Sequence, residues 1–154
     1  MILALDNALG TTGYAVFKKD KTLVYCDKFK TKSKGLDDKL NEITDYLLYL
    51  VERFEITHIV IEDTQSQSNK DTFKKLSILN GSIREFCILN ELTYTVVPVT
   101  TWRKYLCIPQ RPRDLSKKSA QAFVYNRYGL KLSEDECEAI CIGVYYISTI
   151  GDRI

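Results

Sequence analysis

The chain has 154 residues, of which 45% are hydrophobic and 27% are charged, with a formal net charge of +2. This composition excludes a disordered chain, a collagen-like repeat and a small disulfide-built protein. The apolar runs are far shorter than the roughly 20 residues that cross a bilayer. We expect one domain over residues 1–154, no membrane partner, no secretion signal and a cytoplasmic location.

The first thirty residues predict three strands joined by turns. Residues 2–5 form a continuous apolar run, and residues 14–17 form a second one. Gly10 and Gly13 bracket Thr11 and Thr12, which indicates a turn between these two strands. A polar turn at residues 18–21 leads into a third strand that begins with residues 23–26. Together they predict a β-meander.

The middle of the chain alternates helices with strands. Leucine and isoleucine recur with a period of 3.6 over residues 36–54, which predicts a helix. Residues 59–61 form a buried strand, residues 71–92 a second long helix, and residues 95–97 a fifth strand. Gly81 lies inside the second helix at a cost of about 1 kcal/mol relative to alanine, so we expect it to mark close packing.

The remainder is predicted to be helical. A short helix begins at residues 100–102, with Thr100 or Thr101 as its N-cap, and a loop covers residues 110–114. A helix over residues 116–128 stops at Gly129. Ser133 and Glu136 form a capping box for a last helix that runs to about residue 150. This order predicts an α/β fold with a mixed five-stranded sheet and covering helices.

Four acidic residues stand where elements end or begin. Asp6 and Glu62 directly follow apolar strands, and Asp135 and Glu138 lie three residues apart near the start of the last helix. Strand ends and a helix start can converge in a mixed sheet, although acids at a helix start are also favoured by its dipole. Converging carboxylates need a cation, and their oxygens suit Mg²⁺ or Mn²⁺. Two such ions can activate water and stabilise a leaving oxygen in phosphodiester hydrolysis.

The basic residues are unevenly distributed. Eight of them, against one acid, lie between residues 100 and 131, and we call them the basic tract: Arg103, Lys104, Arg111, Arg113, Lys117, Lys118, Arg127 and Lys131. An acidic run follows at residues 134–138. A basic tract beside an acidic cluster indicates a polyanion held next to a cation site, and the alternative is an ordinary solvated face.

Several segments resemble RuvC-type Holliday-junction resolvases. Residues 5–16 (LDNALGTTGYAV) resemble the opening of that family, and residues 59–62 (IVIE) resemble its second motif. Residues 117–121 (KKSAQ) resemble its lysine-bearing helix, and residues 135–142 (DECEAICI) its last helix. The resemblance covers essentially the whole chain in order and spacing, and residues 102–104 (WRK) look most like the phage-encoded branch.

This resemblance implies an RNase H-like fold, a homodimer, and a crossover junction endodeoxyribonuclease that nicks opposed strands of four-way DNA junctions with two Mg²⁺ or Mn²⁺ ions per active site. By position, Asp6, Glu62, Asp135 and Glu138 would hold the metal. Lys118 would lie beside the scissile phosphate, with Lys117 as the second choice. We expect the DNA contacts to come from the basic tract: Arg103, Lys104, Arg111, Arg113, Lys117 and Lys118.

The chain departs from the family pattern in three places. Asn7-Ala8 replaces the frequent Pro-Gly, and we expect the turn to survive because asparagine tolerates turn geometry. Glu138 stands where aspartate is more frequent. Gln65 stands where many members carry an aromatic residue that helps to unstack bases; Phe73 could replace it, or could belong to the core.

Other interpretations remain open. Gln65 and the modest net charge fit a nuclease of lower substrate selectivity, one that acts on forks, flaps or replication intermediates. The basic tract alone would fit a non-catalytic branched-DNA-binding module. The turn at residues 10–13 also resembles an actin-like ATPase, but the chain is too short for the second domain of that class, so we expect no nucleotide cofactor. Ile78, Ile88 and Leu89 extend beyond the core stripe of their helix, which favours either a dimer contact or burial within the chain.

Overall fold

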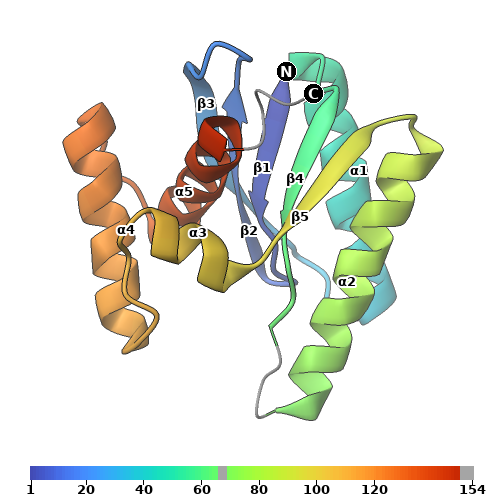
Figure 1. Cartoon of the computed structure of the whole chain (residues 1–154). Coiled ribbons are helices and arrows are strands. Elements are labelled where there is room, and N and C mark those ends of the chain that lie inside the picture. The colour runs from blue at the N-terminus through green and yellow to red at the C-terminus, as the bar shows by residue number, and fades with distance from the viewer. Residues whose placement is uncertain (66–68, 150–154) are drawn as a thin grey trace.

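The computed structural model describes residues 1–65 and 69–149 and contains one five-stranded sheet with helices on both faces (Figure 1). The strands are β1 (Ile2–Asp6), β2 (Thr11–Phe17), β3 (Leu23–Lys30), β4 (His58–Glu62) and β5 (Thr93–Val97). They lie in the order β3-β2-β1-β4-β5. The first three strands pair antiparallel, and β1–β4 and β4–β5 pair parallel, which confirms the predicted mixed sheet.

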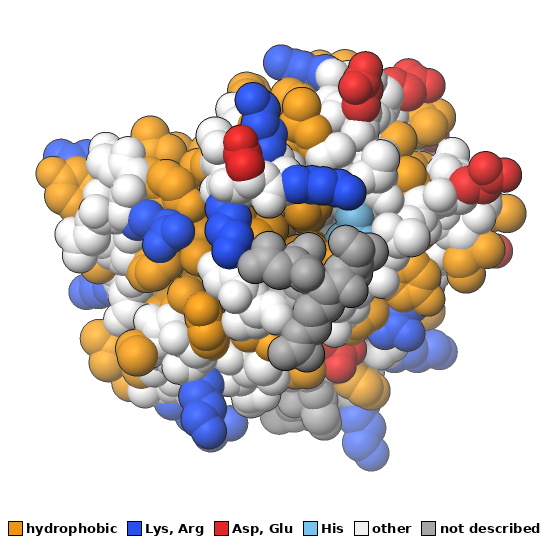
Figure 2. Space-filling view, turned by 45° about the horizontal axis from the view of Figure 1, so that its top comes forward, with side chains coloured by type: hydrophobic (Ala, Val, Ile, Leu, Met, Phe, Trp, Pro, Cys, Tyr) orange, Lys and Arg blue, Asp and Glu red, His pale blue; other side chains and the backbone are white. Residues whose placement is uncertain are grey.

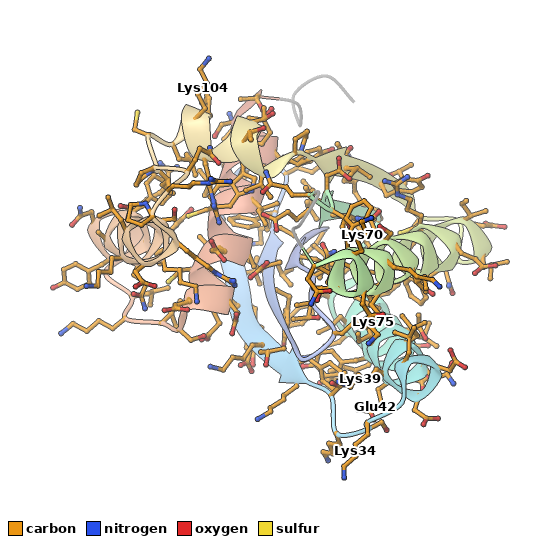
Figure 3. All side chains as sticks on the ribbon, turned by 90° about the horizontal axis from the view of Figure 1, so that it is seen from below. Lys34, Lys39, Glu42, Lys70, Lys75 and Lys104 are labelled. Atoms are coloured by element: carbon orange, nitrogen blue, oxygen red, sulfur yellow. The ribbon has the colours of Figure 1, made fainter. Side chains whose placement is uncertain are left out.

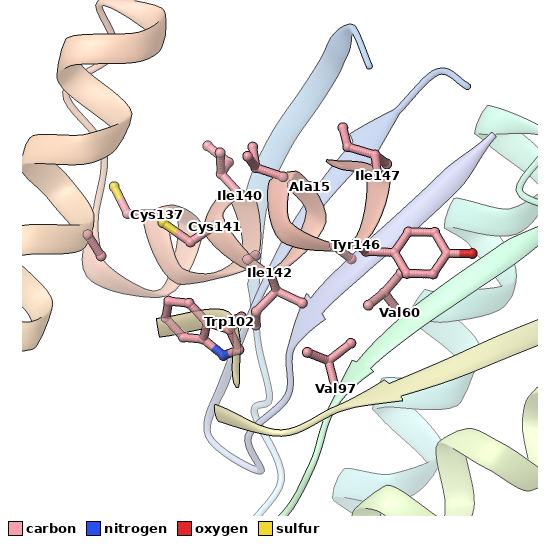
Figure 4. Close-up of a cluster of buried hydrophobic side chains, with 14 of the residues drawn as sticks. Ala15, Val60, Val97, Trp102, Cys137, Ile140, Cys141, Ile142, Tyr146 and Ile147 are labelled. Carbon is pink, nitrogen blue, oxygen red and sulfur yellow. The ribbon is translucent and has the colours of Figure 1, made fainter. Parts of the chain in front are cut away.

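The helices form two layers. α1 (Leu36–Phe54) and α2 (Lys70–Leu89) cover one face of the sheet, and α3 (Val99–Tyr105), α4 (Arg113–Tyr128) and α5 (Glu134–Thr149) lie on the other side (Figure 1). Side chains alternate along each strand, so Leu3 and Leu5 join the α1–α2 core while Ile2 and Ala4 join the α5 core. Figure 4 shows the α5 core, in which Trp102 and Ile142 are packed. Among the described helices, none combines the length and apolar character that a bilayer crossing needs.

Most predicted element boundaries are confirmed to within a few residues. Gly129 ends α4 in the left-handed conformation, and the Ser133 backbone N–H donates to the Glu136 carboxylate as the capping box requires. The cap of α3 was predicted wrongly, because Pro98 holds the N-cap position and neither threonine does. α4 begins earlier than expected, at Arg113. Residue 150, the predicted end of the last helix, lies outside the described residues.

Two glycines have surroundings that differ from their predictions. Gly13 lies inside β2, paired with Asp6, and not in the preceding turn, where the Thr12 hydroxyl donates to the Ala8 carbonyl at 2.9 Å instead. A Cβ on Gly13 would lie 2.0 Å from the backbone oxygen of Asp135, so α5 can approach β2 only at a glycine. Gly81 is exposed, and a Cβ there would meet no described atom within 4 Å, so Gly81 marks no close packing against residues 1–65 or 69–149.

His58 is buried at the opposite end of β4 from Glu62. Its Nδ1 lies 2.7 Å from the Thr93 hydroxyl and its Nε2 lies 3.1 Å from the Thr95 hydroxyl. The Thr93 hydroxyl donates to the Thr57 carbonyl, so Nδ1 must carry the proton that it gives to Thr93. Burial lowers the pKa of His58 from 6.5 to about 4. This histidine is a neutral core residue and no metal ligand is implied.

The clash at position 13 predicts a stability effect. Gly13→Ala should lower the free energy of unfolding by about 1–3 kcal/mol. The new methyl group would meet the backbone oxygen of Asp135, and a backbone atom cannot rotate away as a side chain can. Denaturant unfolding measures this. Gly10→Ala is the matched control, since a Cβ there meets no described atom within 4 Å, and it should stay within about 0.5 kcal/mol of wild type. Equal effects of the two variants would contradict the packing argument.

His58 predicts a pH dependence. In the unfolded chain His58 takes up a proton as the pH falls below 6.5, whereas in the folded chain it does so only near pH 4. The contribution of His58 to the free energy of unfolding is therefore fully present above pH 6.5 and is lost as the pH falls from 6.5 to about 4. The loss is at most about 3 kcal/mol. Subtracting the curve of His58→Gln from that of wild type isolates this contribution. Parallel curves between pH 7 and 4 would refute it.

Candidate active site

Asp6 and Glu62 lie at the same edge of the sheet. They are the last residues of β1 and β4, which are neighbouring parallel strands in register up to the pair Leu5 and Ile61. Both side chains are partly exposed. Adjacent parallel strands end at the same edge, so their terminal residues are neighbours, and this edge faces downward in Figure 1.

The last helix brings two further acids to this edge. Asp135 and Glu138 lie one turn apart at the start of α5. The backbone of Asp135 lies against Gly13, whose strand partner is Asp6. Burial raises the pKa of Asp6 well above its usual range, and the carboxylates of Glu62, Glu138 and Asp135 raise it further. The four acids predicted from the sequence therefore converge, and we call them the acid cluster.

Glu62 is held at three points by three different segments. Its backbone N–H donates to Asn7 Oδ1 at 3.1 Å, and its carbonyl accepts from Asn80 Nδ2 at 2.9 Å. Trp102 Nε1 donates to its carboxylate at 2.8 Å. Burial raises the pKa of Glu62 to about 7, and the Glu138 carboxylate also raises it, while the Trp102 bond opposes the shift. The Asn7 side chain thus continues the β1–β4 pairing one residue beyond the last backbone pair, Leu5 and Ile61.

Arg103 lies inside the site instead of on the surface. Its guanidinium donates to Glu138 Oε1 at 2.7 Å, and both side chains are only about one-seventh exposed, at 15% and 13%. The guanidinium also lies over the Trp102 ring, 5.1 Å from its centroid. Its Nε is buried and has no hydrogen-bond partner among the described residues. Arg103 is therefore an internal counter-ion of the acid cluster.

The donor set fits a hard divalent cation. The acid cluster supplies four carboxylates from three elements, and oxygen ligands of this kind suit Mg²⁺ or Mn²⁺. Across residues 1–65 and 69–149, however, no three histidine, cysteine or acidic side chains are arranged as a ready coordination shell. Trp102 occupies one oxygen of Glu62, and Arg103 occupies one of Glu138. The chemistry of these residues fits a hard divalent cation, and one oxygen of Glu62 and one of Glu138 already accept hydrogen bonds.

The two candidate lysines differ in direction. Ser116, Ala120 and Val124 form the buried stripe of α4. Lys117 follows this stripe and contacts the Glu134 carboxylate at the start of α5, one residue from Asp135. Lys118 lies a further 100° around the helix and is exposed.

The other predicted DNA contacts remain at the surface. Lys104, Arg111 and Arg113 are exposed, on α3 and on the segment that leads into α4. The view onto the acidic edge of the sheet shows lysines projecting on opposite sides, with Lys104 on one side and Lys34 on the other (Figure 3). Figure 2 shows the basic side chains of another face scattered among apolar ones.

Sequence reasoning missed the side chains that hold Glu62. Asn80 interrupts the apolar positions of its helix and is 4% exposed, and a polar residue in such a stripe was the available signal. The sequence pattern places Trp102 at a helix start and in the segment that resembles the phage-encoded branch, and neither feature indicates a contact with an acid. The sequence does not indicate Glu62 as the partner of either Asn80 or Trp102, because both hydrogen bonds join segments that are far apart in the chain.

Solved structures with this fold include three junction-resolving enzymes. Thermus thermophilus RuvC in complex with a Holliday junction matches with a TM-score of 0.77 at 14% identity, covering 97% of this chain and 96% of that one. The Fowlpox virus resolvase, also solved with junction DNA, matches at 0.67 and 14%, covering 97% of both chains. The yeast mitochondrial Holliday junction resolvase matches at 0.62 and 12%, covering 95% of this chain and 77% of that one.

No curated protein sequence matches the chain significantly. The family described as Crossover junction endodeoxyribonuclease RuvC matches residues 2–97, which is more than half of the chain and includes Asp6 and Glu62. The chain therefore belongs to the RuvC family of crossover junction endodeoxyribonucleases.

Proposed function

We propose that this protein is a junction-resolving endonuclease that nicks opposed strands of four-way DNA by metal-dependent phosphodiester hydrolysis. The observation that carries the proposal is the convergence of the acid cluster at one sheet edge, in a chain of the RuvC family. RuvC-type resolvases are metal-dependent nucleases, and two of the structures with this fold were solved with Holliday-junction DNA.

The acid cluster would hold Mg²⁺ or Mn²⁺, two ions in our proposal, which supply an activated water and stabilise the leaving oxygen. The chain's own residues supply position and charge. Asp6 and Glu62 are fixed by strand pairing, and α5 presents Asp135 and Glu138 on one face. Arg103 pairs with Glu138 Oε1, so a cation would use the other carboxylate oxygen or displace this ion pair. Arg103 Nε has no partner among the described residues, and we assign the guanidinium a role in neutralising phosphate charge.

Lys117 is our choice for the lysine beside the scissile phosphate. Lys117 contacts the Glu134 carboxylate, one residue before Asp135 in the chain, whereas Lys118 is exposed and suits a phosphate further along the backbone. This reverses the preference drawn from the sequence. Both residues contribute positive charge to a path for DNA.

The edge strand β3 extends that path. Lys28 pairs with Gly13, which contacts Asp135, and Lys28 and Lys30 are both exposed. Cys26, on the same face of the strand, has a pKa raised to about 11 by burial and by the nearby Glu136 carboxylate, so this face points toward α5. Lysines on an edge strand also discourage edge-to-edge aggregation, so the two roles are compatible.

A second copy of the chain is the partner we propose for α2. Ile78, Gly81 and Ile88 share one exposed stripe, and Ile88 and Leu89 are 66% and 76% exposed. Gly81 weakens the helix and serves no contact within the described chain, which suits close approach of another helix. Two opposed strands need two active sites related by a two-fold axis, and α2 would supply that contact.

A looser branched-DNA nuclease is the alternative with a specific observation in its favour. Gln65 is exposed and offers no aromatic ring, and Phe73 is 37% exposed near the start of α2. Phe73 is thus accessible for stacking on a base, and in that role it would favour the junction-resolving enzyme instead. Parallel cleavage of junction, fork and plain duplex DNA separates the two functions.

Asp6→Asn should reduce junction cleavage by at least about 100-fold, because the variant loses a carboxylate at the centre of the acid cluster. Binding of a synthetic four-way junction should be unchanged or tighter, since one negative charge is lost. Gel-based cleavage and binding assays measure both. Asp45→Asn, a remote and exposed substitution of the same kind, should cleave normally. Persistent cleavage by Asp6→Asn would remove the metal-ligand assignment.

Gly81→Ala separates a dimer from a monomer. In a monomer the added methyl group meets nothing described and should stabilise the helix by up to about 1 kcal/mol. In the proposed dimer it should weaken association, as should Ile88→Lys. Sedimentation at micromolar concentration measures the mass, and Tyr125→Lys on exposed α4 is the control. A strictly monomeric wild type would exclude the paired-nick mechanism.

A further inference from the structure

Glu62 differs from the other three acids in how it is supported. Described hydrogen bonds fix both its backbone N–H and its carbonyl, through Asn7 on one side and Asn80 on the other. The β1–β4 register ends one residue earlier, at Leu5 and Ile61, so Asn7 continues the strand pairing through its side chain. These two contacts leave the Glu62 side chain as the part that still needs support.

Trp102 supplies that support. Its indole Nε1 donates to Glu62 Oε1 at 2.8 Å, and the ring is fully buried in the α5 core. Figure 4 shows the Trp102 ring beneath α5, with its nitrogen at the edge of the apolar cluster. A buried ring cannot change rotamer without disturbing its neighbours, so the direction of this N–H is fixed by packing. An N–H group is uncharged and can therefore stay in place when a cation approaches the same carboxylate.

We propose that Trp102 is a positioning residue for Glu62: with Asn7 and Asn80 fixing the backbone, its indole N–H sets the orientation of the carboxylate before a divalent cation binds. The inference rests on the proposed function and adds a residue to it. Groups that orient ligands from behind typically change metal affinity by roughly 10–100-fold when they are removed. Trp102 makes no contact with the reacting atoms in this scheme.

Trp102 is the only tryptophan in the sequence, so it reports on its own contact. A Mn²⁺ titration of the wild-type protein should change the indole fluorescence, because the cation alters the charge on the carboxylate that the N–H faces. Glu62→Gln keeps an oxygen acceptor and loses the charge, and it should abolish the response. An unchanged wild-type spectrum, in the presence of Mn²⁺-induced thermal stabilisation, would overturn the inference.

Trp102→Phe removes the N–H and keeps an aromatic ring in the core. We expect the Mn²⁺ concentration for half-maximal thermal stabilisation, and that for half-maximal cleavage, to rise about 10–100-fold. Val99→Ala is the matched control, since Val99 is on the same helix and in the same core and no contact between its side chain and the acids is described. It should lower the melting temperature without metal and leave the half-saturating Mn²⁺ concentration within about twofold.

The outcomes separate the two proposals. A Trp102→Phe protein that responds to Mn²⁺ as wild type does, or a Val99→Ala protein that loses the response equally, would overturn the positioning role while the nuclease assignment stands. A wild-type protein that neither binds Mn²⁺ nor cuts a junction would overturn the proposed function itself. If Trp102→Phe does not fold, the wild-type and Glu62→Gln fluorescence titrations decide the question.

Discussion

Repulsion among four carboxylates opposes the folded arrangement at the end of β1 and β4. Burial and neighbouring charges together raise the pKa of Asp6 and Glu62, the latter from 4.5 to about 7. The Glu62 shift alone costs at most about 3 kcal/mol at neutral pH. A fully buried leucine or isoleucine contributes about 1.5–3 kcal/mol, so Leu5 and Ile61, which directly precede the two acids, are enough to offset it.

Three constraints of different kinds keep the acids together. Parallel pairing of β1 with β4 fixes Asp6 beside Glu62, and the missing Cβ of Gly13 lets the start of α5 reach them. Arg103 neutralises part of the charge through Glu138. The strand pairing and the glycine act through the backbone, whereas the ion pair acts through charge. The fold thus fixes the positions of the four acids, and their negative charge favours a cationic partner, which Arg103 provides for Glu138.

The sequence predicted what depends on local periodicity. Strand and helix positions follow from apolar spacing, and the acids at strand ends could be read directly because a charge after a buried strand is costly without a partner. The direction of Arg103 could not be read, since α3 has seven residues and tertiary packing turns the side chain inward. The choice between Lys117 and Lys118 depends on which side of the helix is buried. The apolar spacing of Ala120 and Val124 indicates that side in the sequence.

Two consecutive residues of α3 act on the acid cluster in opposite ways. The Trp102 N–H is neutral, so its bond to Glu62 is compatible with a divalent cation on the same carboxylate. The Arg103 guanidinium carries a full charge that a cation near Glu138 would repel. In the proposed function, a cation would therefore leave the first contact in place and weaken the second. Glu62 would then be the more rigid ligand and Glu138 the more adjustable one, because a packed indole orients the first carboxylate and a competing charge pairs with the second.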